Sequence, residues 1–309
     1  MPNSKSNSWK YGLAGGFSAF STHAVLVPLD VIKTRIQIYP QQYQNGTLST
    51  LKTIARNEGL AALTLGFSST AIGYFLQGSM KFGLFEVIKS SIMNSSLIGG
   101  KERVMGRGGD LSYLQFPIYI TSSAMAEACA TVVLCPWEAI RIKTVNQPLK
   151  YGNVNVFKGL KMIAVEEGLL NGYFRGLIPI LAKQVPYTCV QLTCFSYTTE
   201  FFYGNFLPNR LGMKKQDLTT TQQLNLSVGA GILAGMVSSL ASHPADTLLS
   251  LVNKPGEQRN IFQIMKDIGF KGVWRGVVPR CLMVSFLSAG MFLVYDSSKL
   301  ALGLQTTGG

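Results

Sequence analysis

Three times along this chain of 309 residues, a proline is followed two positions later by a carboxylate. The pairs are Pro28 and Asp30, Pro136 and Glu138, and Pro244 and Asp246, and each step between them spans 108 residues. Self-similarity at a fixed period is the signature of one structural unit that is repeated. The sequence therefore predicts three similar units, at residues 1–110, 111–215 and 216–309.

Each unit contains two long runs without a charged residue. They cover residues 11–29, 59–80, 111–126, 184–199, 218–245 and 281–295. A membrane helix needs about 20 residues to cross roughly 30 Å of hydrocarbon, so six runs predict six transmembrane helices. Most runs also contain Ser, Thr, Gln or Gly, which suits a bundle whose polar groups face an internal cavity.

A short amphipathic stretch that ends in glycine follows the first run of each unit, at residues 48–59, 157–168 and 261–269. Each stretch predicts a surface helix between two membrane helices. An odd number of such units places both termini on one side of the membrane. Gly12-xxx-Gly16 and Gly231-xxx-Gly235 predict close helix contacts. We expect an all-α membrane protein with three pseudo-symmetric repeats.

Composition argues against several other classes of protein. A net charge of +13 would suit nucleic acid, but 28 consecutive uncharged residues would not. The five cysteines lack CxxC spacing and lie in apolar segments, so we expect buried thiols and no metal site. No nucleophile–base pair or phosphate-gripping loop is recognisable, so we expect neither enzyme activity nor a cofactor. The N-terminal stretch lacks the pattern of a signal peptide or presequence.

The proline–acid pairs extend into a longer motif, Pro-x-acid-x-x-base-x-base. It reads Pro28-x-Asp30-x-x-Lys33-x-Arg35 and Pro136-x-Glu138-x-x-Arg141-x-Lys143, whereas the third copy has Leu249 and Leu251 in place of bases. With this pattern repeated across nearly the whole chain, the sequence resembles the mitochondrial carrier family. The resemblance implies a multi-pass transporter of the mitochondrial inner membrane that works by alternating access, with its short amphipathic helices in the matrix.

The resemblance also implies a matrix gate of ion pairs at the ends of the odd-numbered helices. It would pair Asp30 with Arg141 and Asp246 with Lys33, and leave Glu138 without a partner because the third motif lacks its first base. The prolines should kink these helices and bring their ends together. Two bridges instead of three should make this gate easier to open.

A second family motif, aromatic-acid-x-x-base, lies at the opposite ends of the even-numbered helices. It reads Phe85-Glu86-x-x-Lys89 and Tyr295-Asp296-x-x-Lys299. In the second unit we align Tyr197 and Thr198 with it, with Glu200 next to the position where a base is expected. The resemblance therefore implies a cytoplasmic gate of Glu86, Lys89, Asp296 and Lys299 that is incomplete in the second unit.

Three bases, Lys81, Lys183 and Arg280, lie within the even-numbered helices, one in each unit. Of the others, 15 lie at or beyond the proline ends and 10 at the opposite surface, which favours a matrix location for the proline ends. Intramembrane bases mark substrate paths, and three converging cations suit an anion. Alternatively, Lys183 and Arg280 extend to the matrix surface.

Two titratable residues of the odd-numbered helices share a face with the gate acids. His23 precedes Asp30 by seven residues, and Glu127 precedes Glu138 by eleven, about 20° off the same face. Histidine titrates near neutrality and a buried carboxylate can hold a proton, so we expect both to take part in proton coupling. A structural role for the lone histidine stays open.

Local motifs resemble the phosphate carriers within this family. They are Thr22-His23, Met125-Ala126-Glu127, HPADTLLS from residue 243, Gln77-Gly78-xx-Lys81-Phe82-Gly83 and Lys183-Gln184-Val185-Pro186-Tyr187. This resemblance implies phosphate–proton symport, or equivalently phosphate–hydroxide exchange. The residues that would hold the oxyanion are Gln77, Lys81, Lys183, Gln184 and Arg280, and the residues that would handle the proton are His23 and Glu127.

Two positions depart from the phosphate-carrier pattern. Gln191 stands where a lysine is expected, and Met291 stands where a polar residue is expected. The alternatives are a carrier for another anion or a copper complex, and a channel or membrane scaffold without turnover. Basic residues near the matrix helices predict contacts with anionic lipid, for which cardiolipin is a candidate. We expect a functional monomer.

Overall fold

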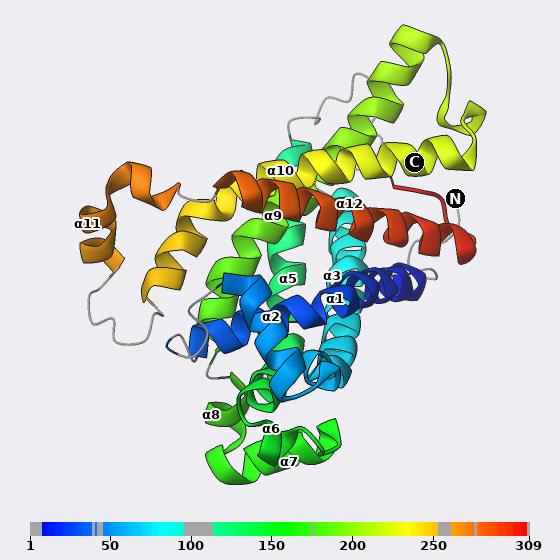
Figure 1. Cartoon of the computed structure of the whole chain (residues 1–309). Coiled ribbons are helices and arrows are strands. Elements are labelled where there is room, and N and C mark those ends of the chain that lie inside the picture. Colours follow the sequence, from blue (N-terminus) through cyan, green and yellow to red (C-terminus); the bar gives the residue numbers. More distant parts are fainter. Residues whose placement is uncertain are drawn as a thin grey trace.

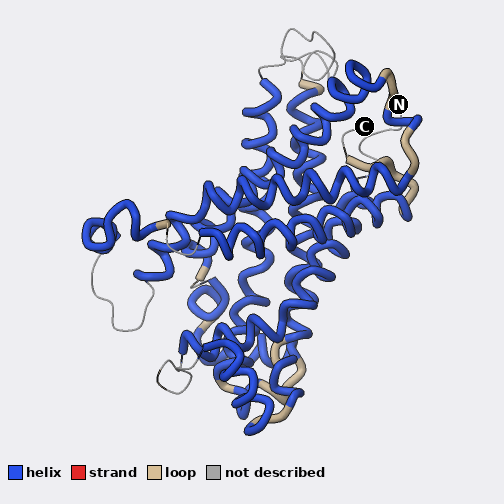
Figure 2. Tube along the Cα trace, turned by 45° about the horizontal axis from the view of Figure 1, so that its top comes forward, coloured by secondary structure: helices blue, strands red, loops and turns tan. Residues whose placement is uncertain are grey.

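The computed structural model describes residues 8–38, 41, 46–95, 114–174, 176–252, 261–274 and 277–307. Throughout this part of the chain the regular structure is helical, without a strand (Figure 2). The six long helices are α1 (Ser8–Ile38), α3 (Phe67–Met93), α5 (Gln115–Asn146), α9 (Leu177–Phe201), α10 (Thr220–Val252) and α12 (Val277–Ala301). Two long helices per unit agree with the sequence prediction.

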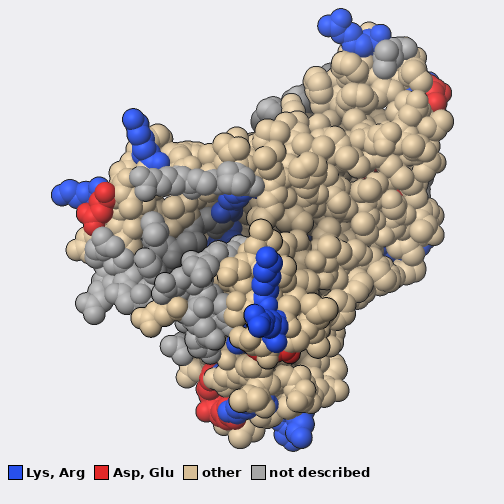
Figure 3. Space-filling view, viewed as in Figure 1, with Lys and Arg blue, Asp and Glu red and all other residues tan. Residues whose placement is uncertain are grey.

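The long helices form a closed ring in chain order. Each one packs against the next, and α12 packs against α1. Both chain ends lie at the same end of the ring (Figure 1), as an odd number of two-helix units requires. We call this end the terminal face, and the opposite end, which carries most of the short helices, the proline face. Figure 3 shows a broad uncharged surface over the long helices, as a membrane protein needs.

Within the described part of the chain, five helices are long and apolar enough to cross a membrane. These spans are Ser8–Ile36, Leu60–Met93, Gln115–Asn146, Thr220–Ala245 and Arg280–Ala301. The sixth long helix, α9, is not among them, because Lys183, Gln184, Gln191 and several threonines lower its hydropathy. It lies in the ring between α5 and α10, where neighbouring helices cover its polar side chains. Hydropathy alone thus supports five spans, and the ring contains six helices.

The short helices form the connections of the ring. Those at the proline face are α2 (Gly46–Asn57), η2 (Leu60–Thr64), α6 (Pro148–Tyr151), α7 (Val156–Glu167), α8 (Leu169–Phe174) and α11 (Ile261–Val273). The predicted amphipathic stretches correspond to α2, α7 and α11. At the terminal face, η4 (Phe202–Leu211) and η5 (Lys215–Asp217) join α9 to α10.

The predicted amphipathic stretches end in the same backbone conformation in all three units. Gly59, Gly168 and Gly269 have φ of 85°, 80° and 62°, with ψ of 165°, 161° and 175°. Essentially only glycine reaches this region, because a Cβ atom would collide with the backbone. The chain can therefore leave the surface helix in the same direction each time, which makes the three units alike in space.

Small residues allow close packing of the two long helices in the first and third units. A Cβ atom on Gly12 would lie 3.2 Å from the carbonyl oxygen of Ser79 on α3. Cβ atoms on Gly231 and Gly235 would lie 2.9 Å and 2.7 Å from Cα atoms of α12. The predicted GxxxG contacts are thus confirmed, and the backbones of α10 and α12 approach as closely as only glycine permits.

Gly235→Ala is expected to lower the thermal stability, because the new methyl group must push α12 away. Overpacking of this kind costs about 1–3 kcal/mol. Gly229 lies on the same helix, where a Cβ atom would meet nothing within 4 Å. Gly229→Ala is therefore the matched control and should keep or raise the melting temperature, since alanine is the better helix former. Equal melting temperatures for the two variants in detergent would contradict this packing.

Candidate transport site

A buried ion pair lies inside the helix ring. The ammonium nitrogen of Lys81 on α3 is 3.4 Å from the carboxylate of Glu127 on α5, and the two side chains are 8% and 0% exposed. Charges removed from water in this way need close partners, because desolvation costs several kcal/mol per ion. Two residues to which the sequence assigned separate roles are therefore in direct contact.

Three neutral groups complete the surroundings of the Glu127 carboxylate. The amide of Gln77 donates to it at 2.9 Å, the hydroxyl of Thr131 at 3.2 Å and the hydroxyl of Thr188 at 2.9 Å. These donors come from α3, α5 and α9, so Glu127 ties the first unit to both long helices of the second. Thr131 and Thr188 have no motif that marks them in the sequence, although Thr131 lies one turn after Glu127.

His23 lies on the wall formed by α1 and α3. Its ring stacks on that of Tyr74, with centroids 3.6 Å apart and planes inclined by 12°. The imidazole is within electrostatic reach of both Lys81 and Arg141. His23 is thus placed between the buried ion pair and the charged residues of the proline face.

Arg141 of α5 binds two carboxylates at the proline face. Its guanidinium lies 2.9 Å from Asp30 of α1 and 2.5 Å from Glu138, one turn earlier on α5. The ion pair between the first and second units is the expected one. The expectation that Glu138 lacks a partner is wrong, because one guanidinium can serve two carboxylates at once. The side chains of Lys33 and Asp246 lie outside the described residues.

The other expected anion-binding bases lie closer to the proline face than Lys81 does. Lys183 lies in the second turn of α9 and Arg280 in the first turn of α12, and Arg280 donates to the hydroxyl of Ser242 at 3.3 Å. Lys183 is exposed and lies within electrostatic reach of Arg280 and Arg141, whereas its neighbour Gln184 is half-buried. The three bases therefore form two groups at different depths instead of converging on one point.

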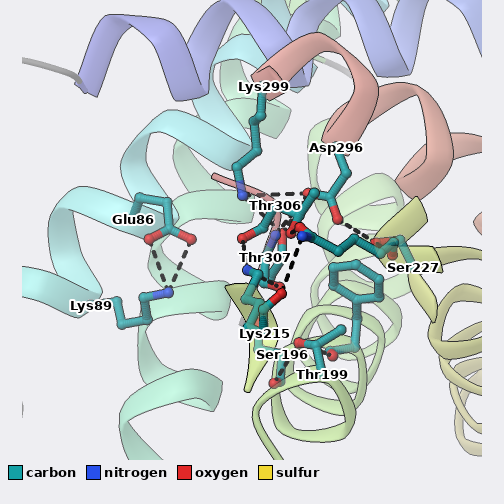
Figure 4. A network of polar contacts seen from close by, with 12 residues as sticks. Glu86, Lys89, Ser196, Thr199, Lys215, Ser227, Asp296, Lys299, Thr306 and Thr307 are labelled. Atoms are coloured by element: carbon teal, nitrogen blue, oxygen red, sulfur yellow. Dashed lines mark hydrogen bonds and ion pairs between the residues drawn. The ribbon is translucent and has the colours of Figure 1, made fainter. Parts of the chain in front are cut away.

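At the terminal face, the expected gate residues pair within their own helices (Figure 4). Lys89 lies 2.9 Å from Glu86 on α3, and Lys299 lies 3.4 Å from Asp296 on α12. Both pairs are three residues apart in sequence, which places them on one helix face. In each of these two copies of the motif, the acid and the base therefore form an ion pair with each other.

In the second unit, the corresponding layer contains Phe195, Ser196 and Thr199. Phe195 is 2% exposed and stacks on Phe292 of α12 at 3.5 Å, whereas Tyr197 is 49% exposed. The alignment on Tyr197 and Thr198 is therefore wrong by two residues. Two buried hydroxyl groups take the places of the acid and the base (Figure 4). Phe85, Phe195 and Tyr295 are not evenly spaced in the sequence, so only the burial of Phe195 reveals this register.

Glu200, which lies one residue before the base position of the same alignment, bonds to α5 instead. It accepts hydrogen bonds from the amide of Gln115, at 2.5 Å, and from the hydroxyl of Tyr119. Lys89 lies over the ring of Tyr119, with its nitrogen 5.7 Å from the centroid. In the second unit, the Glu200 carboxylate is thus held at the terminal face by uncharged donors of α5.

The two positions that depart from the expected pattern both have defined surroundings. Gln191 of α9 donates to Ser288 of α12 at 2.7 Å and to Tyr187 at 2.9 Å. The NH2 group of the amide is satisfied by these two hydroxyl groups, whereas a lysine would bring a further charge to this wall. Met291 is 8% exposed and packs in the apolar core with Phe292. Tyr187 and Ser288 are additional polar residues of the interior.

A cavity of about 780 Å³ lies at the proline face, between the first and second units. Its lining includes Gly66, Ser68 and Ser69 at the start of α3, and Asn155 and Val156 at the start of α7. Backbone N–H groups at helix N-termini attract anionic groups. The cavity therefore offers two such termini to one ligand.

Comparison with known proteins agrees with this architecture. A family model described as mitochondrial carrier protein matches residues 4–96, 112–206 and 221–305, one match in each unit. The chain belongs to the mitochondrial carrier family. It is accordingly a multi-pass transporter of the mitochondrial inner membrane and not an enzyme.

Several relatives match the chain over most of its length. "Mitochondrial substrate carrier family protein N" of Dictyostelium discoideum is 39% identical over 300 residues, which cover 96% of this chain and 95% of the relative. "Phosphate carrier protein, mitochondrial" of Caenorhabditis elegans is 35% identical, covering 94% and 80%. "Solute carrier family 25 member 3" of Bos taurus is 34% identical, covering 94% and 75%.

Lys81→Met is expected to destabilise the protein by about 3–5 kcal/mol, because Glu127 is left charged and buried. Adding Glu127→Gln should restore most of the loss, since the amide is neutral and can still accept from Thr188. The exposed pair Lys150 and Glu166 is the control, and its removal should change stability by about 0–1 kcal/mol. Thermal unfolding in detergent measures these differences. A double variant no more stable than Lys81→Met would contradict the pairing.

Proposed function

We propose that this carrier moves inorganic phosphate together with a proton, or equivalently exchanges phosphate for hydroxide. The buried pair of Lys81 and Glu127 carries the proposal. It places a cation that can bind an oxyanion in contact with a carboxylate that can take up a proton. The names of the phosphate-carrier relatives support the choice of substrate.

Coupling follows from the charge balance at this pair. Lys81 is neutralised by Glu127 as long as the carboxylate is ionised. Protonation of Glu127 removes that negative charge and leaves the ammonium free for a phosphate monoanion, so the net charge of the buried site is unchanged. Either step alone would leave a buried charge uncompensated, which is costly. Anion and proton therefore bind together.

The groups around Glu127 suit both states of its carboxyl group. The hydroxyl groups of Thr131 and Thr188 donate to the carboxylate, and a hydroxyl can also rotate to accept. A protonated Glu127 can thus donate to a threonine, while Gln77 continues to donate to its other oxygen. Gln77 and Lys81 both contact the Glu127 carboxylate, so both lie where an oxyanion would be held.

The residues between this site and the proline face supply the two pathways. His23, stacked on Tyr74 between Lys81 and Arg141, is the proton carrier on the matrix side. Lys183, Gln184 and Arg280 attract the anion near the same face and pass it to Lys81. An anion from the proline face would thus meet Lys183 and Arg280 first and Lys81 second.

Alternating access requires that the two faces open in turn. The matrix gate consists of Asp30, Lys33, Glu138, Arg141 and Asp246 at the proline face. The cytoplasmic gate consists of Glu86, Lys89, Asp296 and Lys299 at the terminal face. The pair of Arg141 and Asp30 joins two units, so it must break when the matrix side opens.

The cavity between the first and second units suits a lipid phosphate group. Its two helix N-termini can bind such a group, and its apolar lining includes Leu65, Phe67 and Phe157. We assign it to an anionic lipid, with cardiolipin as the candidate, and the carrier to a functional monomer. A lipid there would bind the first two units together and stabilise the ring.

Uptake of labelled phosphate into liposomes that contain the purified protein tests the proposal. Saturable uptake is expected, and an inward proton gradient should increase it. Unlabelled phosphate and arsenate should compete for the site, whereas a carrier for another anion or a copper complex would be indifferent to phosphate. No phosphate uptake by the folded protein would overturn the assignment of the cargo.

Glu127→Gln and His23→Ala are expected to remove the effect of the proton gradient on uptake. The glutamine cannot take up a proton, and alanine interrupts the path from the proline face. Glu166→Gln, which changes an exposed carboxylate of α7, is the control and should keep the full dependence on pH. The initial rate of uptake as a function of pH measures the effect. Unchanged pH dependence in both variants would exclude these residues as the proton path.

A further inference from the structure

The chain reverses direction at the terminal end of α12 and returns across the terminal face. Gly303 has a φ of 73°, and the N–H of Leu304 donates back to the carbonyl oxygen of Lys299 at 2.8 Å. A glycine in the left-handed conformation ends the helix in this way without strain. We call residues 302–307 the strap.

Thr307 of the strap lies between the acid and the base of the third-unit gate motif (Figure 4). Its N–H and hydroxyl donate to Asp296 at 3.0 Å and 2.8 Å, and its hydroxyl accepts from Lys299 at 3.0 Å. One hydroxyl group thus bridges the two charges, which lie 3.4 Å apart.

Further hydrogen bonds join the strap to three other segments. Lys215 of η5 donates to the carbonyl oxygens of Thr306 and Thr307, at 2.7 Å and 3.3 Å. Thr306 donates to Gln223 of α10 at 2.8 Å. Lys10 of α1 donates to the carbonyl oxygen of Leu302 at 2.9 Å. The strap therefore connects the first and third units, and also the link from the second unit.

The strap compensates for charges that are otherwise deeply buried. Asp296 is 0% exposed and Lys299 is 3% exposed. A buried pair needs hydrogen bonds to its remaining lone pairs and protons, or desolvation outweighs the attraction. Besides the strap, the Asp296 carboxylate also accepts from Ser227 of α10. In the first unit, Glu86 and Lys89 are more exposed, at 20% and 12%, so water can help to solvate them.

We propose that Thr307 is a positioning residue of the cytoplasmic gate, and that the strap holds the terminal face closed. The proposal rests on the transport function, since a gate has this meaning only in a carrier whose faces open in turn. The helices α1, α10 and α12 cannot separate at this face while the strap bonds to all three. Loss of these bonds shifts the equilibrium toward the state that is open at the terminal face.

The test measures access to the interior from the terminal face. Ser288 lies on α12, about two turns from Asp296, and faces the interior, where it bonds to Gln191. Ser288→Cys therefore serves as the reporter in every variant. Liposomes captured by an external N-terminal tag present their terminal face outward. A membrane-impermeant maleimide is added outside, and labelling at residue 288 is followed by mass spectrometry.

Thr307→Val, which keeps the shape and removes the hydroxyl, is expected to speed labelling about tenfold, because hydrogen bonds to charged groups are strong. A chain that ends at Gly303 should be labelled at least as fast. Thr307→Ser should restore the slow rate, since its hydroxyl can make the same bonds. Thr221→Val, on an exposed threonine of α10, is the matched control and should label slowly. Unchanged labelling in both Thr307→Val and the shortened chain would overturn the proposal.

Thermal unfolding shows whether each variant is folded. If Thr307→Val does not fold, Lys215→Met takes its place, because it leaves Thr307 intact and removes the two bonds to strap carbonyls, together with the contact of the ammonium over the Tyr203 ring. It should still speed labelling. An unchanged rate in folded Lys215→Met would then count against the strap. The labelling assay needs no phosphate, so the two proposals fail separately. Absence of phosphate uptake overturns the cargo assignment, and slow labelling of folded strap variants overturns the strap.

Discussion

The buried contact between Lys81 and Glu127 is the interaction on which the rest of the ring depends. At 3.4 Å and an effective dielectric constant of about 20, the attraction amounts to about 5 kcal/mol. Desolvation costs several kcal/mol for each ion, so the pair contributes little net stability. Misplacement of α3 or α5 would nevertheless leave a charge unpaired, which is far more costly. The pair therefore specifies how the helices meet without making the protein much more stable.

This near balance of energies is also what a coupled carrier needs. If the pair were strongly stabilising, Glu127 would keep Lys81 from binding an incoming anion. If Lys81 were unpaired, it would bind the anion whether or not a proton was bound as well. Because Glu127 has three neutral donors besides Lys81, it can lose the ammonium and keep a satisfied environment. In the proposed mechanism, the hydrogen-bonded surroundings would thus lower the barrier to exchanging a carboxylate for a phosphate anion.

The repeated features of the fold were accessible from the sequence, because a period and a helical face depend on local residues. The prolines, the glycine that ends each surface helix and the close contact at Gly235 follow from spacing and steric limits. Features that depend on which residues meet in the folded chain could not be predicted from the sequence. Arg141 serves two carboxylates, which reverses the expectation for Glu138. The second-unit terminal motif has lost its charges, so only the burial of Phe195 reveals its register.

The strap had no sequence signal at all, since Thr306 and Thr307 follow no motif. Their importance comes from Asp296 and Lys299, whose burial creates a need for donors and acceptors that only the folded chain can supply. Contacts between distant segments, such as Lys10 with Leu302, likewise depend on closure of the ring. The hydrogen bonds of the interior are therefore where the structure adds most to what the sequence predicts.

The three units share a backbone plan, but their charges are distributed unequally around the interior. Lys81 and Glu127 lie on the wall of α3 and α5, whereas Gln191, Tyr187 and Ser288 form a neutral, hydroxyl-rich wall of α9 and α12. An anion between these walls would be held by one cation and oriented by neutral groups. A lysine in place of Gln191 would add a second strong attraction at the same depth, and release would be slower. Under the proposed function, the neutral wall would thus favour turnover over tight binding, which is the property that separates a carrier from a binding protein.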